Sequence, residues 1–282
     1  MITKELEHLV QEQRKAGAGT SYMRNVLKEY LQMYLLYFVY SSPKYSPILV
    51  FTGGTCLRQF FGLERLSEDV DFDLLSPVDP VHIKTDLESF FVKKYKYNDV
   101  QVSLKQQGRQ LLLKFPVLKL LSLAKDSESD LLYVKMDLSP NPSRHYNVIT
   151  TSKNSFGFNF VAVHYDLPSL MAGKVHAVLT RQHFRGKDDV LTLKGRDYFD
   201  LLWYLKKAVQ PNIKRLSDML GEHLTPELLV KKLDQKVTLA TTRHRDFFKA
   251  DITPLLKNAD MVPAYVQNYQ AEYMRCRGYL LG

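Results

Sequence analysis

The stretch that decides the fold is Phe51-Thr-Gly-Gly-Thr-Cys-Leu-Arg58, followed closely by Arg65-Leu-Ser-Glu-Asp-Val-Asp-Phe-Asp73. The apolar residues before Gly53 predict a short buried strand, residues 47–52, that runs into a glycine turn and then a helix. Glycine leaves the backbone N–H groups of such a turn open to a phosphate, which the positive end of the helix dipole also favours. The alternative is a turn that needs glycine only for its backbone angles.

The second half of this stretch places two carboxylates on one side of a strand. Residues 70–75 alternate between apolar and polar, as a half-buried strand does, so Asp69 and Asp71 project to the same face. Adjacent carboxylates repel each other unless a cation lies between them, and Mg²⁺ (or Mn²⁺) prefers carboxylate and phosphate oxygens. A solvated strand face is the alternative, although aspartate is unfavourable in strands. Asp73 shares this face as a supporting or solvated group.

Together the two elements resemble the core motif of the polymerase-β-like nucleotidyltransferase superfamily. More narrowly, they are similar to the AbiEii/AbiGii-type nucleotidyltransferases, the toxins of type IV toxin–antitoxin systems, which include the mycobacterial MenT toxins. That pattern is a Gly-Gly-Thr-x-Leu-Arg turn and then Arg-x-Ser-x-Asp-hydrophobic-Asp-Phe. Here the pattern is matched by residues 53–58 and 65–72.

A second block strengthens the resemblance. Members of the family carry a lysine on a helix, a basic stretch, and then an Arg-Asp-x-x-Asp-Leu helix. This chain has Lys174 within a helical pattern, Arg181 soon after it, and Lys194-Gly-Arg-Asp-Tyr-Phe-Asp-Leu201. The resemblance covers roughly residues 45 to 205.

The resemblance implies a specific role in a catalytic centre for each of these motif residues. Gly53, Gly54 and Thr55 would hold the β- and γ-phosphates of a nucleoside triphosphate. Asp69 and Asp71 would coordinate Mg²⁺ ions that bridge the phosphates and stabilise charge on the attacking and leaving oxygens.

A third carboxylate is expected on a neighbouring strand, where it ligates a metal ion and helps to deprotonate the acceptor. Asp137 is the candidate, because it ends an apolar strand, where a charged residue needs a reason; the alternative is an aspartate that caps a turn before Pro140. Lys174 would approach the triphosphate or the leaving pyrophosphate, although an exposed helix lysine is the ordinary case. Asp197 would contact Lys174 or the nucleotide.

Other charged residues leave two interpretations open. Arg58 and Arg65 flank the glycine turn and could neutralise phosphate, or could pair with Glu64 or Glu68. Arg196 and Asp200 are spaced as a structural i, i+4 pair. A set of basic residues could contact an RNA acceptor or could lie in solvated loops: Arg181, Arg185, Lys187 and Arg243-His244-Arg245.

The organisation expected is α+β, with a polymerase-β-like nucleotidyltransferase lobe over residues 1–165 and a helical lobe over residues 166–282 that completes the active-site cleft. In the first lobe Ser21 could cap the second helix. The helices expected there are 4–15, 21–40 and 80–94. The strands expected are 47–52, 70–75, 100–105, 110–115, 131–138 and 158–164. The helices expected in the second lobe are 167–182, 194–209, 212–222, 226–240 and 260–279.

Composition agrees with a soluble globular protein that binds polyanions. Of 282 residues, 39 are Lys or Arg and 30 are Asp or Glu, so the net charge is 39 − 30 = +9, which favours nucleotides or nucleic acid as partners. The two cysteines lack metal-binding spacing, which suits a reducing compartment. No run is long and apolar enough to span a bilayer, and the N-terminus is unlike a secretory signal. The expected location is the cytoplasm.

The function expected is transfer of a nucleoside monophosphate from an NTP to an acceptor hydroxyl, with release of pyrophosphate. Resemblance to the MenT branch makes the 3′ end of tRNA the acceptor, and type IV systems imply a cognate antitoxin. Two alternatives stay open: an NTP-dependent phosphotransferase acting on a protein or small molecule, and a catalytically silent nucleotide- or RNA-binding module.

Overall fold

The computed structural model describes residues 2–181, 183–185 and 190–281, and of residues 183–185 and 190–192 it describes the backbone alone. The chain divides into two compact units. Unit 1 comprises Met1–Asn141 and Thr150–His164, and unit 2 comprises Pro142–Ile149 and Tyr165–Gly282.

Unit 1 is built on a seven-stranded mixed sheet with the strand order β3-β4-β5-β2-β1-β7-β6. At its centre β2 is antiparallel to β1 and parallel to β5, and β1 is parallel to β7. The strands are β1 (Leu49–Thr52), β2 (Asp69–Leu74), β3 (Gln101–Lys105), β4 (Gln110–Pro116), β5 (Leu131–Pro140), β6 (Val148–Ser155) and β7 (Phe158–Tyr165). The helices are α1 (Ile2–Lys15), α2 (Thr20–Tyr40), α3 (Gly53–Phe61) and α4 (Pro80–Tyr95).

Alternation along the two central strands separates an apolar face from a polar one. Val70 pairs with Met136 and Phe72 pairs with Leu138, and all four side chains are buried. Side chains on alternate positions point to the opposite face. The other face therefore carries the acidic residues of β2 and those that pair with them on β5.

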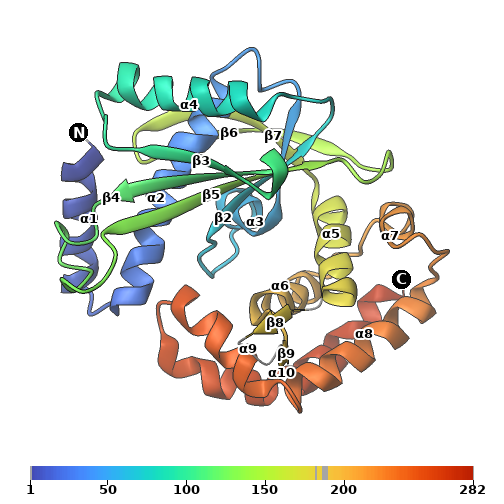
Figure 1. Ribbon diagram of the computed structural model, residues 1–282. Helices are drawn as coiled ribbons and strands as arrows, with labels where there is room; N and C mark the ends of the chain where they lie inside the picture. The colour runs from blue at the N-terminus through green and yellow to red at the C-terminus, as the bar shows by residue number, and fades with distance from the viewer. Residues whose placement is uncertain (1, 182, 186–189, 282) are drawn as a thin grey trace. The chain divides into compact units, whose positions relative to one another are not determined.

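Aromatic packing joins α2 and α4 to the sheet. The ring of Tyr34 on α2 stacks on Phe91 of α4 at 5.7 Å between centroids, and Phe91 packs edge-on against Phe115 of β4. The ring centroids of Tyr40, at the end of α2, and Phe72 of β2 are 6.3 Å apart. Figure 1 shows α1 alongside α2, and it shows α4 lying along the sheet.

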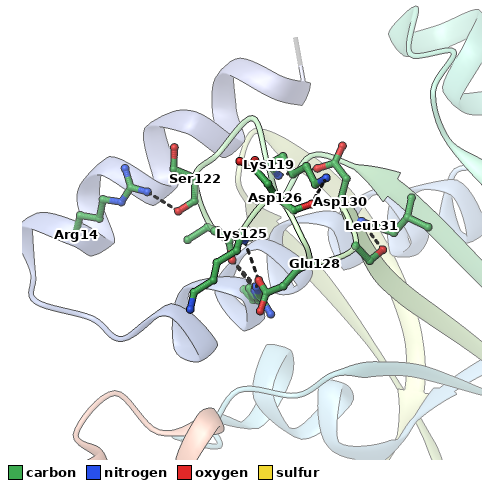
Figure 2. A network of polar contacts seen from close by, with 11 residues as sticks. Arg14, Lys119, Ser122, Lys125, Asp126, Glu128, Asp130 and Leu131 are labelled. Carbon is green, nitrogen blue, oxygen red and sulfur yellow. Dashed lines mark hydrogen bonds and ion pairs between the residues drawn. The ribbon is translucent and has the colours of Figure 1, made fainter.

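The loop between β4 and β5 is tied to the N-terminal helices by arginines. Arg14 of α1 donates to the carbonyls of Leu121 and Ser122 at 2.9 and 3.1 Å. Arg24 of α2 donates to the Leu123 carbonyl and forms an ion pair with Glu128 at 3.2 Å. Within the loop, the backbone N–H of Lys119 donates to Asp130 and that of Lys125 to Glu128, as Figure 2 shows. These contacts fix the segment that leads into β5.

Unit 2 is mainly helical. Its central helix, α6, buries both apolar and acidic side chains, among them Leu201, Trp203 and Asp200. Tyr269 of α10 donates a hydrogen bond to the Tyr198 carbonyl of α6 at 2.7 Å. The elements are α5 (Leu167–Thr180), β8 (His183–Arg185), β9 (Val190–Thr192), α6 (Gly195–Lys206), α7 (Ile213–Leu220), α8 (Pro226–Thr241), α9 (Arg245–Ile252) and α10 (Val262–Cys276).

The α+β class is confirmed, and several local features differ from the sequence-based expectations; one is the antiparallel strand pair β8 and β9, which was not predicted. Residues 148–155 form the edge strand β6 and residues 245–252 form α9, and neither element was predicted. Ser21 does not cap α2: the helix begins at Thr20, Gly19 occupies the N-cap position, and that residue has no side chain with which to cap.

Candidate active site

The glycine turn and the acidic strand meet where β1 ends and α3 begins. Gly53 is the first residue of α3 and has φ +78°, a left-handed conformation that favours glycine. A Cβ built on Gly53 would overlap Oδ2 of Asp71 and lie 2.7 Å from its Cγ. In the sheet Asp71 pairs with Thr52, the residue before the turn. The structure therefore brings the carboxylate of Asp71 directly against the start of the helix.

Asp137 lies beside Asp71 on the next strand. The two residues are partners in the parallel register of β2 and β5, so their side chains share the polar face of the sheet. Because β5 continues to Pro140, Asp137 lies inside the strand and does not cap a turn. Gln110 of β4 donates to Oδ1 of Asp137 at 2.7 Å, which orients that carboxylate.

Asp69 begins β2 on the same face. It pairs in register with Lys135, whose Nζ lies 3.5 Å from Oδ1 of Asp69. The side chain of Asp69 is 22% exposed and that of Lys135 is 45% exposed, so this ion pair is weak. An exposed lysine can move aside when another cation approaches the carboxylate.

Two side chains of the Arg-x-Ser motif pack beneath the second glycine. A Cβ on Gly54 would lie 2.8 Å from Nη2 of Arg65 and 2.9 Å from Oγ of Ser67. Arg65 is only 1% exposed and donates to the Leu66 carbonyl at 2.8 Å. Gln32 of α2 donates to the Ser67 carbonyl at 2.9 Å. Arg65 thus supplies buried positive charge below the turn.

Thr55 and Arg58 have structural contacts. The buried Thr55 hydroxyl donates to the Asp69 carbonyl at 2.5 Å and so holds α3 to β2, which leaves the Thr55 backbone for any phosphate contact. Arg58 donates from Nε to Glu29 at 2.7 Å and from Nη1 to the carbonyls of Leu63 and Glu64. Its carboxylate partner is therefore Glu29 of α2, which was not among the partners expected.

Two buried residues lie near the acidic pair, Asp73 on the same face of β2 and Cys56 on α3. Asp73 is 8% exposed, so it is not a solvated group. Cys56 is fully buried on α3, and burial first, with the Asp71 charge second, raises the pKa of its thiol well above the usual value. The thiol therefore stays protonated and takes no part as a nucleophile.

In unit 2, Lys174 of α5 is held between two carboxylates of α6. Its Nζ lies 2.8 Å from Oδ1 of Asp197 and 2.8 Å from Oδ2 of Asp200. The lysine side chain is 12% exposed and both aspartates are buried. Lys174 is therefore not an ordinary surface lysine, and Asp197 meets the expectation of a contact with it.

Arg181 adds a second cation to Asp197, at 3.1 Å from Oδ2. Burial alone would raise the pKa of the Asp197 carboxyl, but Lys174 and Arg181 together hold it well below its usual value. Asp197 is thus a fixed negative charge that orients two basic side chains.

The remaining basic candidates are only partly described. Arg243 is exposed, and His244 and Arg245 are half-buried at the start of α9. Burial and the neighbouring Arg243 lower the pKa of His244, so this imidazole is neutral near pH 7. The side chain of Arg185 and the whole of Lys187 lie outside the described residues.

The donor set on the polar face fits a hard divalent cation. Asp69, Asp71 and Asp137 offer only oxygen ligands from two adjacent strands, beside a helix N-terminus suited to phosphate. In the part of the chain that is described, no three His, Cys, Asp or Glu side chains are already gathered into a metal cage. Mg²⁺ takes a few carboxylates and completes its shell with water and substrate phosphates.

Sequence reasoning missed the residues that position these groups. Glu29 of α2 contacts Arg58, Gln110 of β4 contacts Asp137, and Lys135 of β5 contacts Asp69. Each partner lies on another strand or on an element distant in the chain. The sequence indicates for Asp200 only a structural i, i+4 pair with Arg196. Its i, i+3 spacing from Asp197 was the available signal, because it places both carboxylates on one side of α6.

The fold is similar to that of two crystal structures from Helicobacter pylori. One is a protein assigned as a nucleotidyltransferase, with 16% identity, coverage of 90% of this chain and 95% of that chain, and a TM-score of 0.50. The other is JHP933, with 15% identity, coverage of 91% and 93%, and a TM-score of 0.51. At such low identity the likeness concerns the fold. No curated protein matches the chain by sequence.

The family model of the nucleotidyl transferase AbiEii toxin, from type IV toxin–antitoxin systems, matches residues 35–269. The chain therefore belongs to the AbiEii nucleotidyltransferase toxin family, and the resemblance drawn from its motifs is confirmed. Membership makes it a nucleotidyltransferase and implies an NTP substrate, a divalent metal and an antitoxin partner. None of the helices in the described residues has the length and hydropathy needed to cross a bilayer.

Proposed function

We propose that this toxin transfers a nucleoside monophosphate from an NTP to the 3′-terminal hydroxyl of tRNA and releases pyrophosphate. The observation that carries this proposal is the position of Asp71, which lies against Gly53 on one side and beside Asp137 on the other. A phosphate at the glycine turn would then lie next to two carboxylates on one face of the sheet.

Different groups of the protein bind the triphosphate, hold the metal ion and accept the proton. Backbone N–H groups at the start of α3 bind the triphosphate, and buried Arg65 supports them with positive charge. Asp69, Asp71 and Asp137 would hold Mg²⁺, which when bound supplies Lewis-acid stabilisation of the phosphate oxygens. Asp137, oriented by Gln110, accepts the proton of the attacking hydroxyl. The new bond joins that oxygen to the α-phosphorus, and the bond to the β-phosphate oxygen breaks.

The net charge supports the choice of a polyanionic substrate, and Lys174 has a separate role in the proposal. We assign Lys174, oriented by Asp197 and Asp200, to the leaving pyrophosphate. A net charge of +9 favours association with RNA, since phosphate neutralisation dominates such binding. Arg243 is an exposed candidate for contact with tRNA.

The test is transfer of label from each of the four NTPs in the presence of Mg²⁺ and total RNA. Label at the α-phosphate should appear in RNA of tRNA size, and label at the γ-phosphate should not. Transfer of γ-label to protein or a small molecule would instead establish a phosphotransferase. Absence of label in RNA would exclude the tRNA acceptor, and no transfer at all would leave a silent nucleotide-binding module.

Asp71→Asn tests the carboxylate that carries the proposal. We expect transfer to fall by about 100-fold or more, because the amide keeps the shape and loses the charge that the cation requires. Asp99→Asn is the matched control: it neutralises an exposed aspartate of unit 1 and should retain activity. Full activity in Asp71→Asn would overturn the proposed site.

A further inference from the structure

Unit 1 contains a second concave site, which the proposed reaction does not use. It is a cavity of about 600 Å³, within the range of small-ligand pockets. Four tyrosines and two phenylalanines line it, together with Glu5, Gly157 and Asn159. The tyrosines come from α2 and α4, Glu5 comes from α1, and Phe156 lies in the turn between β6 and β7.

The cavity lies far from the glycine turn along the sheet. Phe158, which lines it, begins β7, and His164 near the end of β7 pairs with Phe51 just before the turn. Six residues of strand separate these points, roughly 20 Å at about 3.3 Å per residue. The cavity and the acidic face are therefore separate sites on the same sheet.

Tyr30 and Tyr34 pack tightly in the wall of the cavity, with 5% and 4% of their surface exposed. The hydroxyls of Tyr30 and Tyr34 are 2.8 Å apart and hydrogen-bonded, and their rings pack edge to face at 5.4 Å. Phe156 packs edge-on against Tyr30 at 5.4 Å. Burial raises the pKa of Tyr95 to about 12 and that of Tyr34 further still, so the phenols remain neutral at physiological pH.

Glu5 is the single charged residue among those described as lining the cavity. It is close enough to Tyr30 and Tyr34 to contribute to the raised pKa of both hydroxyls. Lys94 lies nearby, but its Nζ sits over the ring of Tyr37, at 4.2 Å, and near Phe90, which does not line the cavity. Its ammonium donates a hydrogen bond to the Tyr37 hydroxyl at 2.9 Å, so this ring already contacts a cation at its hydroxyl end.

We propose that this cavity is a binding site for an organic cation, an alkylammonium or guanidinium group, held by the tyrosine rings and Glu5. Aromatic faces attract cations through the ring quadrupole, and a neighbouring carboxylate adds direct attraction. The same carboxylate repels phosphate, so nucleotides do not fit this site. The cation can be a free small molecule or a basic side chain of a protein.

The probes are choline and its neutral carbon isostere 3,3-dimethylbutan-1-ol, titrated against the intact chain while the ring resonances of tyrosine and phenylalanine are followed by NMR. Choline should shift resonances of the cavity, and the isostere should bind about tenfold more weakly or not at all. Nα-acetyl-arginine methylamide and Nα-acetyl-lysine methylamide, in a parallel arm, represent a protein side chain. If choline binds more tightly, the natural cation is a free small molecule; if the arginine or lysine derivative binds more tightly, it is a side chain of a protein. Equal binding of the isostere, or failure of every cation to bind, would overturn the proposal.

Two variants assign the binding to the cavity. Glu5→Gln should weaken choline about tenfold, whereas Glu12→Gln, exposed on the same helix and outside the lining, should not. Phe156→Leu removes a ring that is 43% exposed, so it should weaken binding without unfolding unit 1. Asp71→Asn should leave binding unchanged, which separates this site from the proposed active site. Unchanged affinity in both Glu5→Gln and Phe156→Leu would contradict the assignment.

Discussion

At the scale of single residues, Gly53 combines a left-handed backbone with a carboxylate pressed against its Cα. Gly53→Ala should therefore cost about 1–3 kcal/mol of unfolding free energy and abolish most nucleotidyl transfer, because the methyl group would displace Asp71. Thermal denaturation and α-label transfer measure the two effects.

Gly62 provides the control for that substitution. It ends α3 with φ +76° and has no neighbour within 4 Å of a built Cβ. Gly62→Ala should lose about 1 kcal/mol of stability from the backbone alone and keep its activity. Equal loss of activity in both variants would show that displacement of Asp71 is not the cause.

Lys174 and Asp200 form a second case at this scale. Asp200→Asn leaves Lys174 with Asp197 alone, so it should lower the transfer rate and the stability together. A double-mutant cycle with Lys174→Met should give a coupling energy of about 1–3 kcal/mol, measured by denaturant unfolding. Additive effects would show that the 2.8 Å contact contributes nothing to the fold.

At the scale of elements, the contact between α5 and α6 depends on the ionised carboxylate of Asp197. Its folded-state pKa lies below its unfolded value, so its stabilising contribution is present above the unfolded pKa and is lost as pH falls through the folded pKa. Unfolding free energy should fall between about pH 5 and about pH 2, and the fall should be shallower in Asp197→Asn. The prediction would be contradicted if the unfolding free energies of the unmodified protein and of Asp197→Asn fell equally over this pH range.

The loop between β4 and β5 gives a prediction for a tertiary tether. Arg24→Ala removes the donors to the Leu123 carbonyl and Glu128, which should cost about 1–2 kcal/mol and speed amide exchange over residues 118–130. Lys15→Ala, at the exposed end of α1, is the control. Exchange that is unchanged in Arg24→Ala would show that the loop is held by other contacts.

Most elements could be predicted from the sequence because their apolar residues repeat at the period of a strand or a helix. The apolar alternation of β2 and β5 even located Asp71 and Asp137 within expected strands, and β2 begins one residue before the expected range, at Asp69. The edge strand β6 escaped prediction, since its residues 148–155 are largely exposed and show no apolar alternation. Contacts such as Arg58 with Glu29 could not be predicted, because they join helices whose packing no local pattern specifies.

At the scale of the whole molecule, the net charge of +9 gives a prediction for substrate binding. If tRNA is the acceptor, its affinity should fall steeply between about 50 and about 200 mM salt, because each neutralised phosphate releases counterions. Filter binding measures the slope, and Arg243→Ala should reduce it. Affinity that is independent of salt would contradict a polyanionic acceptor.

The two thiols of the chain are both inaccessible, Cys56 on α3 of unit 1 and Cys276 at the end of α10 of unit 2. An alkylating reagent can therefore reach either sulfur only when the surrounding helix opens. Separate rates of iodoacetamide modification at Cys56 and Cys276 would report the opening of each unit independently. An NTP that binds the glycine turn should protect Cys56 and leave the rate at Cys276 as a reference.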